Sequence, residues 1–77
     1  MSKVTVYSTP TCPWCTKAKN YLKENDIEFT DKDVSVDQAG AMEMIRKSNQ
    51  RGVPVIDIDG TILIGFDKPN IDRLLKL

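Results

Sequence analysis

Cys12-Pro13-Trp14-Cys15 is the stretch that decides the fold, because it joins a strand-like run to a helix-like run. The run before it, Val4-Thr5-Val6-Tyr7, is rich in the β-branched and aromatic residues that favour strands. Pro13 suits the first turn of a helix, where its missing N–H costs nothing. The chain has no other cysteine. Two thiols at this spacing at a helix start can open and close a disulfide, which indicates redox chemistry rather than a structural crosslink.

The residues that follow predict a helix, a strand and a second helix. The first helix is expected to end near Asn25, and Ile27-Glu28-Phe29-Thr30 alternates as a strand. Ser35 and Gln38 have the spacing of a capping box, in which Ser35 caps the second helix and Gln38 reaches back to it. The lysines of the first helix are expected to point mainly outward: Lys17, Lys19 and Lys23.

The last third of the chain predicts a hairpin and a final helix. Residues 55–58 and 61–64 favour strands, and Asp59-Gly60 between them is a two-residue hairpin signal. Asp67 is a good N-cap for the helix that follows. A strand–helix–strand unit gives a parallel pair with a right-handed crossover, and the hairpin adds an antiparallel pair. The sequence therefore predicts one α/β domain over residues 1–77, with a mixed four-stranded sheet flanked by three helices.

Composition and charge exclude several classes of function. The 77 residues include 11 basic and 11 acidic ones, without the basic surplus or stripe that a nucleic-acid-binding protein normally shows. The absence of histidine excludes triads and His-ligated metals. No secretory signal and no membrane-spanning apolar run is apparent, so we expect a cytoplasmic protein without membrane attachment. In that reducing compartment a vicinal thiol pair is more often catalytic or metal-binding than structural.

Zinc binding is the main inorganic alternative for the two cysteines. One Cys-x-x-Cys supplies two ligands, whereas a structural zinc site takes four. With no histidine and no second pair, a monomer cannot complete the site, so no bound metal is predicted. A disulfide between Cys12 and Cys15 would close a very small loop and would add little to stability through loop entropy. The pair is therefore not expected to hold the fold together.

Three separately placed motifs resemble those of glutaredoxins. They are Thr11-Cys12-Pro13-Trp14-Cys15, Gly52-Val53-Pro54 before a strand, and Ile64-Gly65-Phe66-Asp67 before the last helix. The resemblance covers nearly the whole chain, and it implies the thioredoxin fold, βαβαββα, and glutathione-linked thiol–disulfide oxidoreductase activity. Many glutaredoxins carry a lysine where this chain has Thr9 and a second glycine where it has Phe66. The latter version is closer to the small glutaredoxin-like hydrogen donors of ribonucleotide reductase.

Cys12 is the expected nucleophile and Cys15 the expected resolving thiol. At a helix cap, unpaired N–H groups and the positive end of the helix dipole favour a thiolate, which is the reactive species. Cys15 lies one turn further in, where burial keeps it protonated until it resolves a mixed disulfide. The resemblance implies that Cys12 attacks a disulfide or a glutathionylated cysteine and that glutathione, a co-substrate rather than a bound cofactor, reduces the pair again.

The other predicted site residues have a structural explanation beside the functional one. Trp14 is either an exposed substrate contact beside the thiols or a core aromatic. Pro54 can simply begin a strand, or it can form the cis turn that the resemblance implies, which leaves the Val53 backbone to pair with a substrate. Asp67 can cap a helix or accept the ammonium of glutathione, and Arg51 can be a solvated surface residue or bind the glycyl carboxylate. The predicted glutathione contacts are Thr9, Pro13, Trp14, Arg51, Val53, Pro54, Gly65, Phe66 and Asp67.

Two other functions stay open on the sequence alone. The chain can be a thioredoxin-like hydrogen donor, for example to ribonucleotide reductase, that thioredoxin reductase reduces again. It can also be an iron–sulfur-binding module in a bridged dimer, although in this family a proline after the first cysteine generally disfavours the cluster. Some relatives carry selenocysteine at position 12. The expected partners of the monomer are glutathione and disulfide-containing or glutathionylated proteins.

Overall fold

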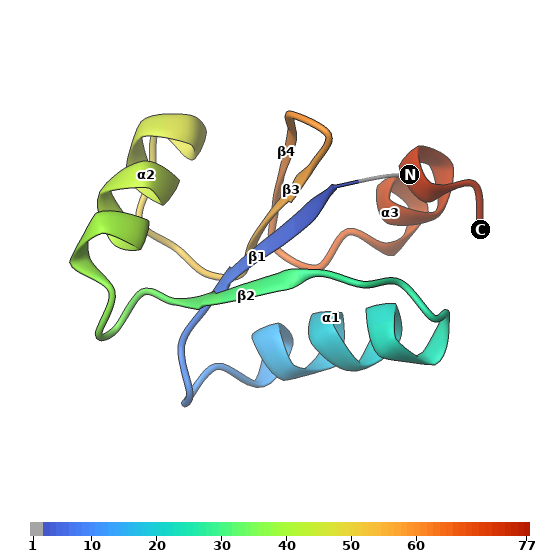
Figure 1. Ribbon diagram of the computed structural model, residues 1–77, viewed down its shortest axis with the longest axis horizontal. Helices are drawn as coiled ribbons and strands as arrows, with labels where there is room; N and C mark the ends of the chain where they lie inside the picture. Colours follow the sequence, from blue (N-terminus) through green and yellow to red (C-terminus); the bar gives the residue numbers. More distant parts are fainter. Residues whose placement is uncertain (1–2) are drawn as a thin grey trace.

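Strands and helices follow one another in the predicted order (Figure 1). The computed structural model describes residues 3–77. Its sheet has the strand order β2-β1-β3-β4, in which β1 pairs with β2 in parallel and with β3 antiparallel, and β3 pairs with β4 antiparallel. The elements are β1 (Val4–Ser8), α1 (Pro13–Glu24), β2 (Thr30–Asp33), α2 (Gln38–Ser48), β3 (Val55–Ile58), β4 (Thr61–Ile64) and α3 (Lys68–Leu75).

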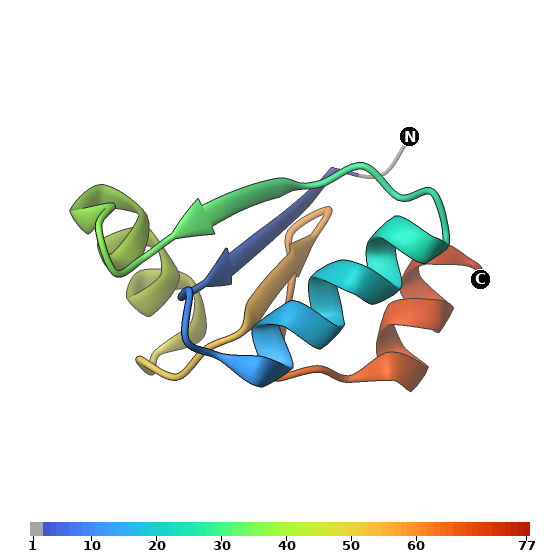
Figure 2. The ribbon, with the colours of Figure 1, turned by 90° about the horizontal axis from the view of Figure 1, so that it is seen from below.

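Helices cover both faces of the sheet (Figures 1 and 2). On one face α1 and α3 contribute Ala18, Leu22 and Ile71 to the main core, which also contains alternate residues of β1 and β3. On the other face α2 places Met44 against Tyr7 and Val55. The strict alternation along β1 divides its side chains between the two cores, as expected for a central strand. Within residues 3–77, no helix has the length and apolar character needed to cross a membrane.

The position of β2 corrects the sequence-based prediction. Ile27-Glu28-Phe29-Thr30 was predicted to pair in the sheet, but the strand runs from Thr30 to Asp33. Ile27 and Phe29 pack against the main core before the strand begins, which explains their apolar alternation. The paired residues are polar because β2 is an edge strand with little of its surface covered.

The start of α2 is a second correction. The capping box predicted for Ser35 and Gln38 is wrong, because Asp37 is the N-cap and its carboxylate accepts the Gly40 N–H at 2.9 Å. Ser35 instead donates its N–H, at 2.9 Å, to the side chain of Asp33. This local turn satisfies the Ser35 groups before the helix begins, so the next acceptor along the chain caps the helix.

The hairpin and the last helix agree with the sequence prediction. Asp59 and Gly60 both have positive φ, 52° and 94°, as a two-residue hairpin turn requires. Asp67 caps α3 by accepting the Asn70 N–H at 3.4 Å. Ile71 of α3 is fully buried, which holds the helix on the same face of the sheet as α1. The loop between β4 and α3 is therefore held at both ends by packed elements, and its Phe66 lies beside Trp14 at the start of α1.

Candidate active site

Cys12 caps the first helix. Its backbone is extended, with φ −99° and ψ 107°, and its Sγ accepts the N–H of Cys15 at 3.1 Å. Its own N–H donates to the carbonyl oxygen of Thr9 at 3.4 Å, which closes the turn after β1. The side chain is half-buried, so an incoming disulfide can reach the sulfur. A helix start with an N–H aimed at sulfur is the arrangement expected for a nucleophilic cysteine.

Cys15 lies behind Cys12 and is fully buried. Burial is the largest cause that raises the pKa of the Cys15 thiol to about 11, followed by the hydrogen bond with the Cys12 side chain. A backbone hydrogen bond from Thr9 and the positive charge of Lys19 act in the opposite direction and lower this pKa. At neutral pH Cys15 is therefore a thiol, as expected for a residue that waits to resolve a mixed disulfide.

A loop far along the chain completes the surroundings of Cys12. The Val53–Pro54 peptide bond is cis, as the resemblance implied, and the Cys12 thiol donates to the Val53 carbonyl oxygen at 3.9 Å. Val53 precedes β3, so its backbone is not part of the strand pairing. The antiparallel pairing of β1 with β3 brings the ends of these strands together and so explains the contact.

A cavity of about 260 Å³ lies beside the Cys12 region, between the start of α1 and the Val53–Pro54 turn. Trp14 is 56% exposed, which decides in favour of a surface position rather than a core aromatic. Its ring lies 6.5 Å from that of Phe66, and Lys17 Nζ lies 4.4 Å from the Trp14 ring centroid. The side chains and backbone that line the cavity all belong to the predicted site: Trp14, Val53, Pro54, Gly65 and Phe66.

The remaining predicted contacts lie outside this cavity. Arg51 is exposed in the loop before β3, and Pro13 is exposed at the first position of α1. Asp67 accepts two hydrogen bonds from Asn70, from its N–H at 3.4 Å and from Nδ2 at 2.6 Å. Thr9 contacts both cysteines through its backbone.

The sequence names Lys17 and Lys19 as possible sources of positive potential near Cys12, but it does not predict the contacts that Lys19 makes. Lys19 was predicted to point outward, but its Nζ donates to Ser8 Oγ at 3.3 Å and to Asp31 Oδ2 at 3.1 Å. Ser8 in turn donates to Asp31 Oδ1 at 2.8 Å. The available signal was helical spacing, since a residue four positions after Cys15 lies on the same side of the helix. The acceptors could not be found that way, because they come from two strands.

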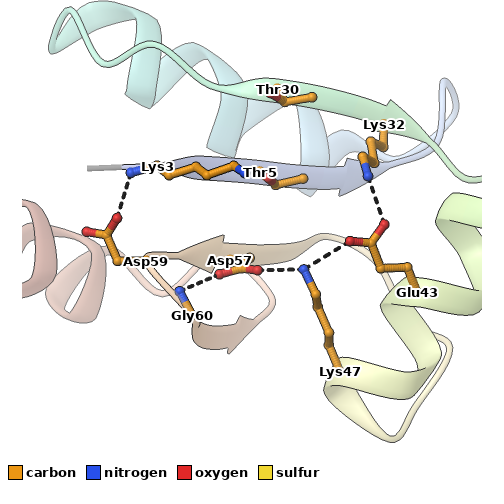
Figure 3. Close-up of a pocket in the computed structure, with 9 residues that line it drawn as sticks. All are labelled: Lys3, Thr5, Thr30, Lys32, Glu43, Lys47, Asp57, Asp59 and Gly60. Carbon is orange, nitrogen blue, oxygen red and sulfur yellow. Dashed lines mark hydrogen bonds and ion pairs between the residues drawn. The ribbon is translucent and has the colours of Figure 1, made fainter. Parts of the chain in front are cut away.

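A hollow of about 530 Å³ lies between α2 and the sheet, and its lining includes neither Cys12 nor Cys15 (Figure 3). Its ion pairs alternate in sign: Lys32 to Glu43 at 2.8 Å, Glu43 to Lys47 at 3.1 Å, and Lys47 to Asp57 at 2.7 Å. These charges are engaged with one another, so this hollow is a polar seam between α2 and the sheet. Within the described part of the chain, no three Cys, Asp or Glu side chains are grouped to hold a metal ion.

Comparison with known proteins finds glutaredoxins and glutaredoxin-like proteins. The family model described as glutaredoxin matches residues 4–63. An uncharacterized glutaredoxin-like 8.6 kDa protein in the rubredoxin operon of Clostridium pasteurianum is 52% identical over 73 residues, covering 95% of this chain and 97% of the relative. Glutaredoxin 3 of Escherichia coli K12 is 32% identical over 83 residues, covering 99% of this chain and 100% of the relative.

Solved structures show the same architecture. A mutant of the thioredoxin-like protein BC3987 superposes with a TM-score of 0.91 at 32% identity, covering 99% of this chain and 97% of that one. The glutaredoxin-like NrdH-redoxin of Escherichia coli, whose structure is described as the basis of a thioredoxin-like activity profile, superposes with a TM-score of 0.81 at 25% identity. The latter match covers 94% of this chain and 93% of that one.

Proposed function

This chain belongs to the glutaredoxin family of thiol–disulfide oxidoreductases, and we propose that it reduces glutathione mixed disulfides and protein disulfides with glutathione as its reductant. Its fold is the thioredoxin fold. The observation that supports the proposal most is the placement of the two sulfurs: Cys12 is reachable beside a cavity, and Cys15 is buried one turn behind it. One sulfur can therefore attack a substrate while the other stays protected.

The reaction proceeds as two exchanges. The Cys12 thiolate attacks one sulfur of the substrate disulfide; the substrate bond breaks, and the electron pair leaves with the other sulfur. Cys15 then loses its proton and attacks Cys12 Sγ, which releases the second substrate thiol and leaves a Cys12–Cys15 disulfide. Two molecules of glutathione reduce this disulfide and become oxidised glutathione. With a glutathione mixed disulfide, Cys12 alone completes the cycle when a second glutathione attacks.

The residues around the cavity support glutathione as the ligand. The Val53 backbone lies outside the sheet beside Cys12, where it can pair strand-fashion with a peptide that carries the reacting cysteine. The start of α3 can bind the γ-glutamyl carboxylate, and Asp67 can accept its ammonium. We assign the glycyl carboxylate to Arg51, which partly replaces the lysine missing at Thr9. The acting unit is a monomeric domain of residues 1–77 in the cytoplasm.

Substituting each cysteine separately tests the assignment of roles. Cys12→Ser is expected to abolish reduction of both a glutathionylated peptide and a protein disulfide, because the nucleophile is lost. Cys15→Ser is expected to retain reduction of the glutathionylated peptide and to lose reduction of the protein disulfide. Oxidation of the nicotinamide coenzyme coupled through glutathione reductase measures both. Normal activity of Cys12→Ser would show that the nucleophile is wrongly assigned.

A second candidate function shares the chemistry but not the reductant. Phe66 stands at the position of the second glycine and packs between Trp14 and Tyr21, with ring centroids 6.5 Å and 5.7 Å away. This feature and the similarity to the NrdH-redoxin favour a hydrogen donor that thioredoxin reductase reduces. Incubating the oxidised protein with each reducing system and following the return of free thiols distinguishes the two. Reduction by glutathione alone supports our main proposal, and reduction only by thioredoxin reductase overturns it.

A further inference from the structure

We infer that Lys19, held by Ser8 and Asp31, is a positioning residue that stabilises the thiolate of Cys15 while it resolves a mixed disulfide. The inference rests on the proposed two-step reaction, but it concerns only the second step and does not depend on the reductant. It assigns a role to a polar cluster next to the active site that neither the sequence motifs nor the cavity beside Cys12 include.

Lys19 is fixed on the side of α1 that faces the sheet. It follows Cys15 by four residues, and side chains at this spacing are neighbours, about 5–6 Å apart at Cβ. Its Nζ is held by Ser8 Oγ at 3.3 Å and Asp31 Oδ2 at 3.1 Å. Ser8 is only 2% exposed, so the hydroxyl that holds Lys19 is buried between α1 and the sheet. The Lys19 side chain is 22% exposed, which reduces the screening of its charge by water.

Charges near Cys15 change when substrate binds covalently. Two charged groups act on the pKa of Cys15, namely Cys12 and Lys19. Asp31 of β2 faces Lys19 and forms an ion pair with it at 3.1 Å. The thiolate of Cys12 raises the pKa of Cys15. In the mixed disulfide Cys12 carries no charge, so this influence disappears. The effect of burial is then opposed by a backbone hydrogen bond from Thr9 and by the Lys19 ammonium.

The step that Lys19 assists balances without any further reagent. The Cys15 thiol releases its proton to water, and the resulting thiolate lies within the field of the ammonium. The thiolate attacks Cys12 Sγ, an Sγ–Sγ bond forms, and the bond from Cys12 to the substrate sulfur breaks. The substrate leaves as a thiolate and takes a proton from water. Lys19 keeps its proton throughout, so its role is electrostatic.

An aromatic disulfide such as dithiobis(nitrobenzoate) separates the two steps, because each attack releases one coloured thiolate. The first release reports Cys12 and the second reports Cys15, with glutathione absent. Lys19→Met retains most of the length of the side chain and removes the charge. We expect its first release to stay within about twofold of wild type. We expect the pH midpoint of its second release to rise by about one unit, which makes that release about tenfold slower at neutral pH.

Two further variants make the result specific. Lys19→Arg retains the positive charge and is expected to retain the wild-type pH midpoint. Lys23→Met removes the same charge from an exposed position further along α1 and is expected to change neither release. An unchanged midpoint in Lys19→Met, or equal slowing of both releases, would overturn the inference. A failure of the glutathione proposal would instead appear in the reductase-coupled assay and leave this experiment unaffected.

Discussion

Phe66 has the most unusual identity among the residues around Cys12. It stands where many glutaredoxins carry a second glycine, and its ring packs against both Trp14 and Tyr21. The same ring lines the cavity beside Cys12 and a shallow groove of about 340 Å³ between α1 and α3. The substitution therefore extends the apolar surface away from the cysteines and along the seam between the two helices.

Removing the Phe66 ring is expected to weaken the packing and to expose the indole. Phe66→Ala should lower the free energy of unfolding by about 2 kcal/mol, less than the roughly 3–5 kcal/mol of a fully buried phenylalanine. Trp14 is the single tryptophan of the chain, so its fluorescence reports the change directly. We expect stronger quenching by acrylamide in Phe66→Ala than in Phe66→Leu, which preserves most of the volume. Wild-type stability and quenching in Phe66→Ala would contradict this account.

At the scale of elements, the start of α2 depends on two residues that constrain each other. Asp37 caps the helix through the Gly40 N–H at 2.9 Å. A Cβ added to Gly40 would lie 2.6 Å from Asp37 Oδ2, closer than the contact allows. The glycine, which weakens a helix interior by up to about 1 kcal/mol, is therefore tolerated because it leaves room for the capping carboxylate.

A double-mutant cycle tests this coupling. Gly40→Ala alone should change the free energy of unfolding little, because the gain in helix propensity is offset by displacement of the cap. In the Asp37→Ala background, which by itself costs about 1 kcal/mol, the same substitution should stabilise the protein by up to about 1 kcal/mol. Urea unfolding of the four proteins measures both effects. Equal stabilisation by Gly40→Ala in both backgrounds would show that the Asp37 carboxylate does not constrain position 40.

The elements also show how far the sequence could be interpreted in advance. Features that depend on local signals are present as predicted. They are the order of strands and helices, the hairpin at Asp59-Gly60, and the caps at Cys12 and Asp67. The predicted start of β2 was wrong. Ile27 and Phe29 lie before the strand and pack against the main core, so their apolar character does not mean that they pair in the sheet. Alternating apolar residues indicate which side chains are buried, but they do not by themselves show which residues form hydrogen bonds between strands.

At the scale of the whole molecule, the two faces of the sheet are stabilised differently. Under α1 and α3 the core contacts are apolar, and one ion pair, Lys19 to Asp31, joins α1 to the edge strand. On the other face, α2 is joined to the sheet by a chain of ion pairs as well as by Met44 (Figure 3). Glu43 and Lys47 of α2 reach Lys32 of β2 and Asp57 of β3. Such contacts, like those of Lys19, depend on tertiary placement, so the sequence could not predict them. The cysteine motif could be predicted because its residues are adjacent in the chain.

The ion pairs of α2 predict how stability responds to acid. Hydrogen bonds from Lys32, then from Lys47, lower the pKa of Glu43 from its ordinary 4.5 to about 2. A carboxyl group whose pKa is lower in the folded state stabilises the fold above its unfolded pKa, and this contribution is lost as pH falls from about 4.5 to about 2.

Glu43→Gln should therefore lower the free energy of unfolding by about 1 kcal/mol at neutral pH, a modest value because the side chains are partly solvated. The difference from wild type should shrink through this pH range and vanish near its lower end. The matched control is Glu28→Gln, because Glu28 is exposed and forms no ion pair within residues 3–77. This variant should show the same loss of stability at acidic pH as wild type. Urea unfolding at successive pH values measures the curves. A constant difference between Glu43→Gln and wild type at all pH values would mean that the Glu43 carboxylate is not what joins α2 to the sheet.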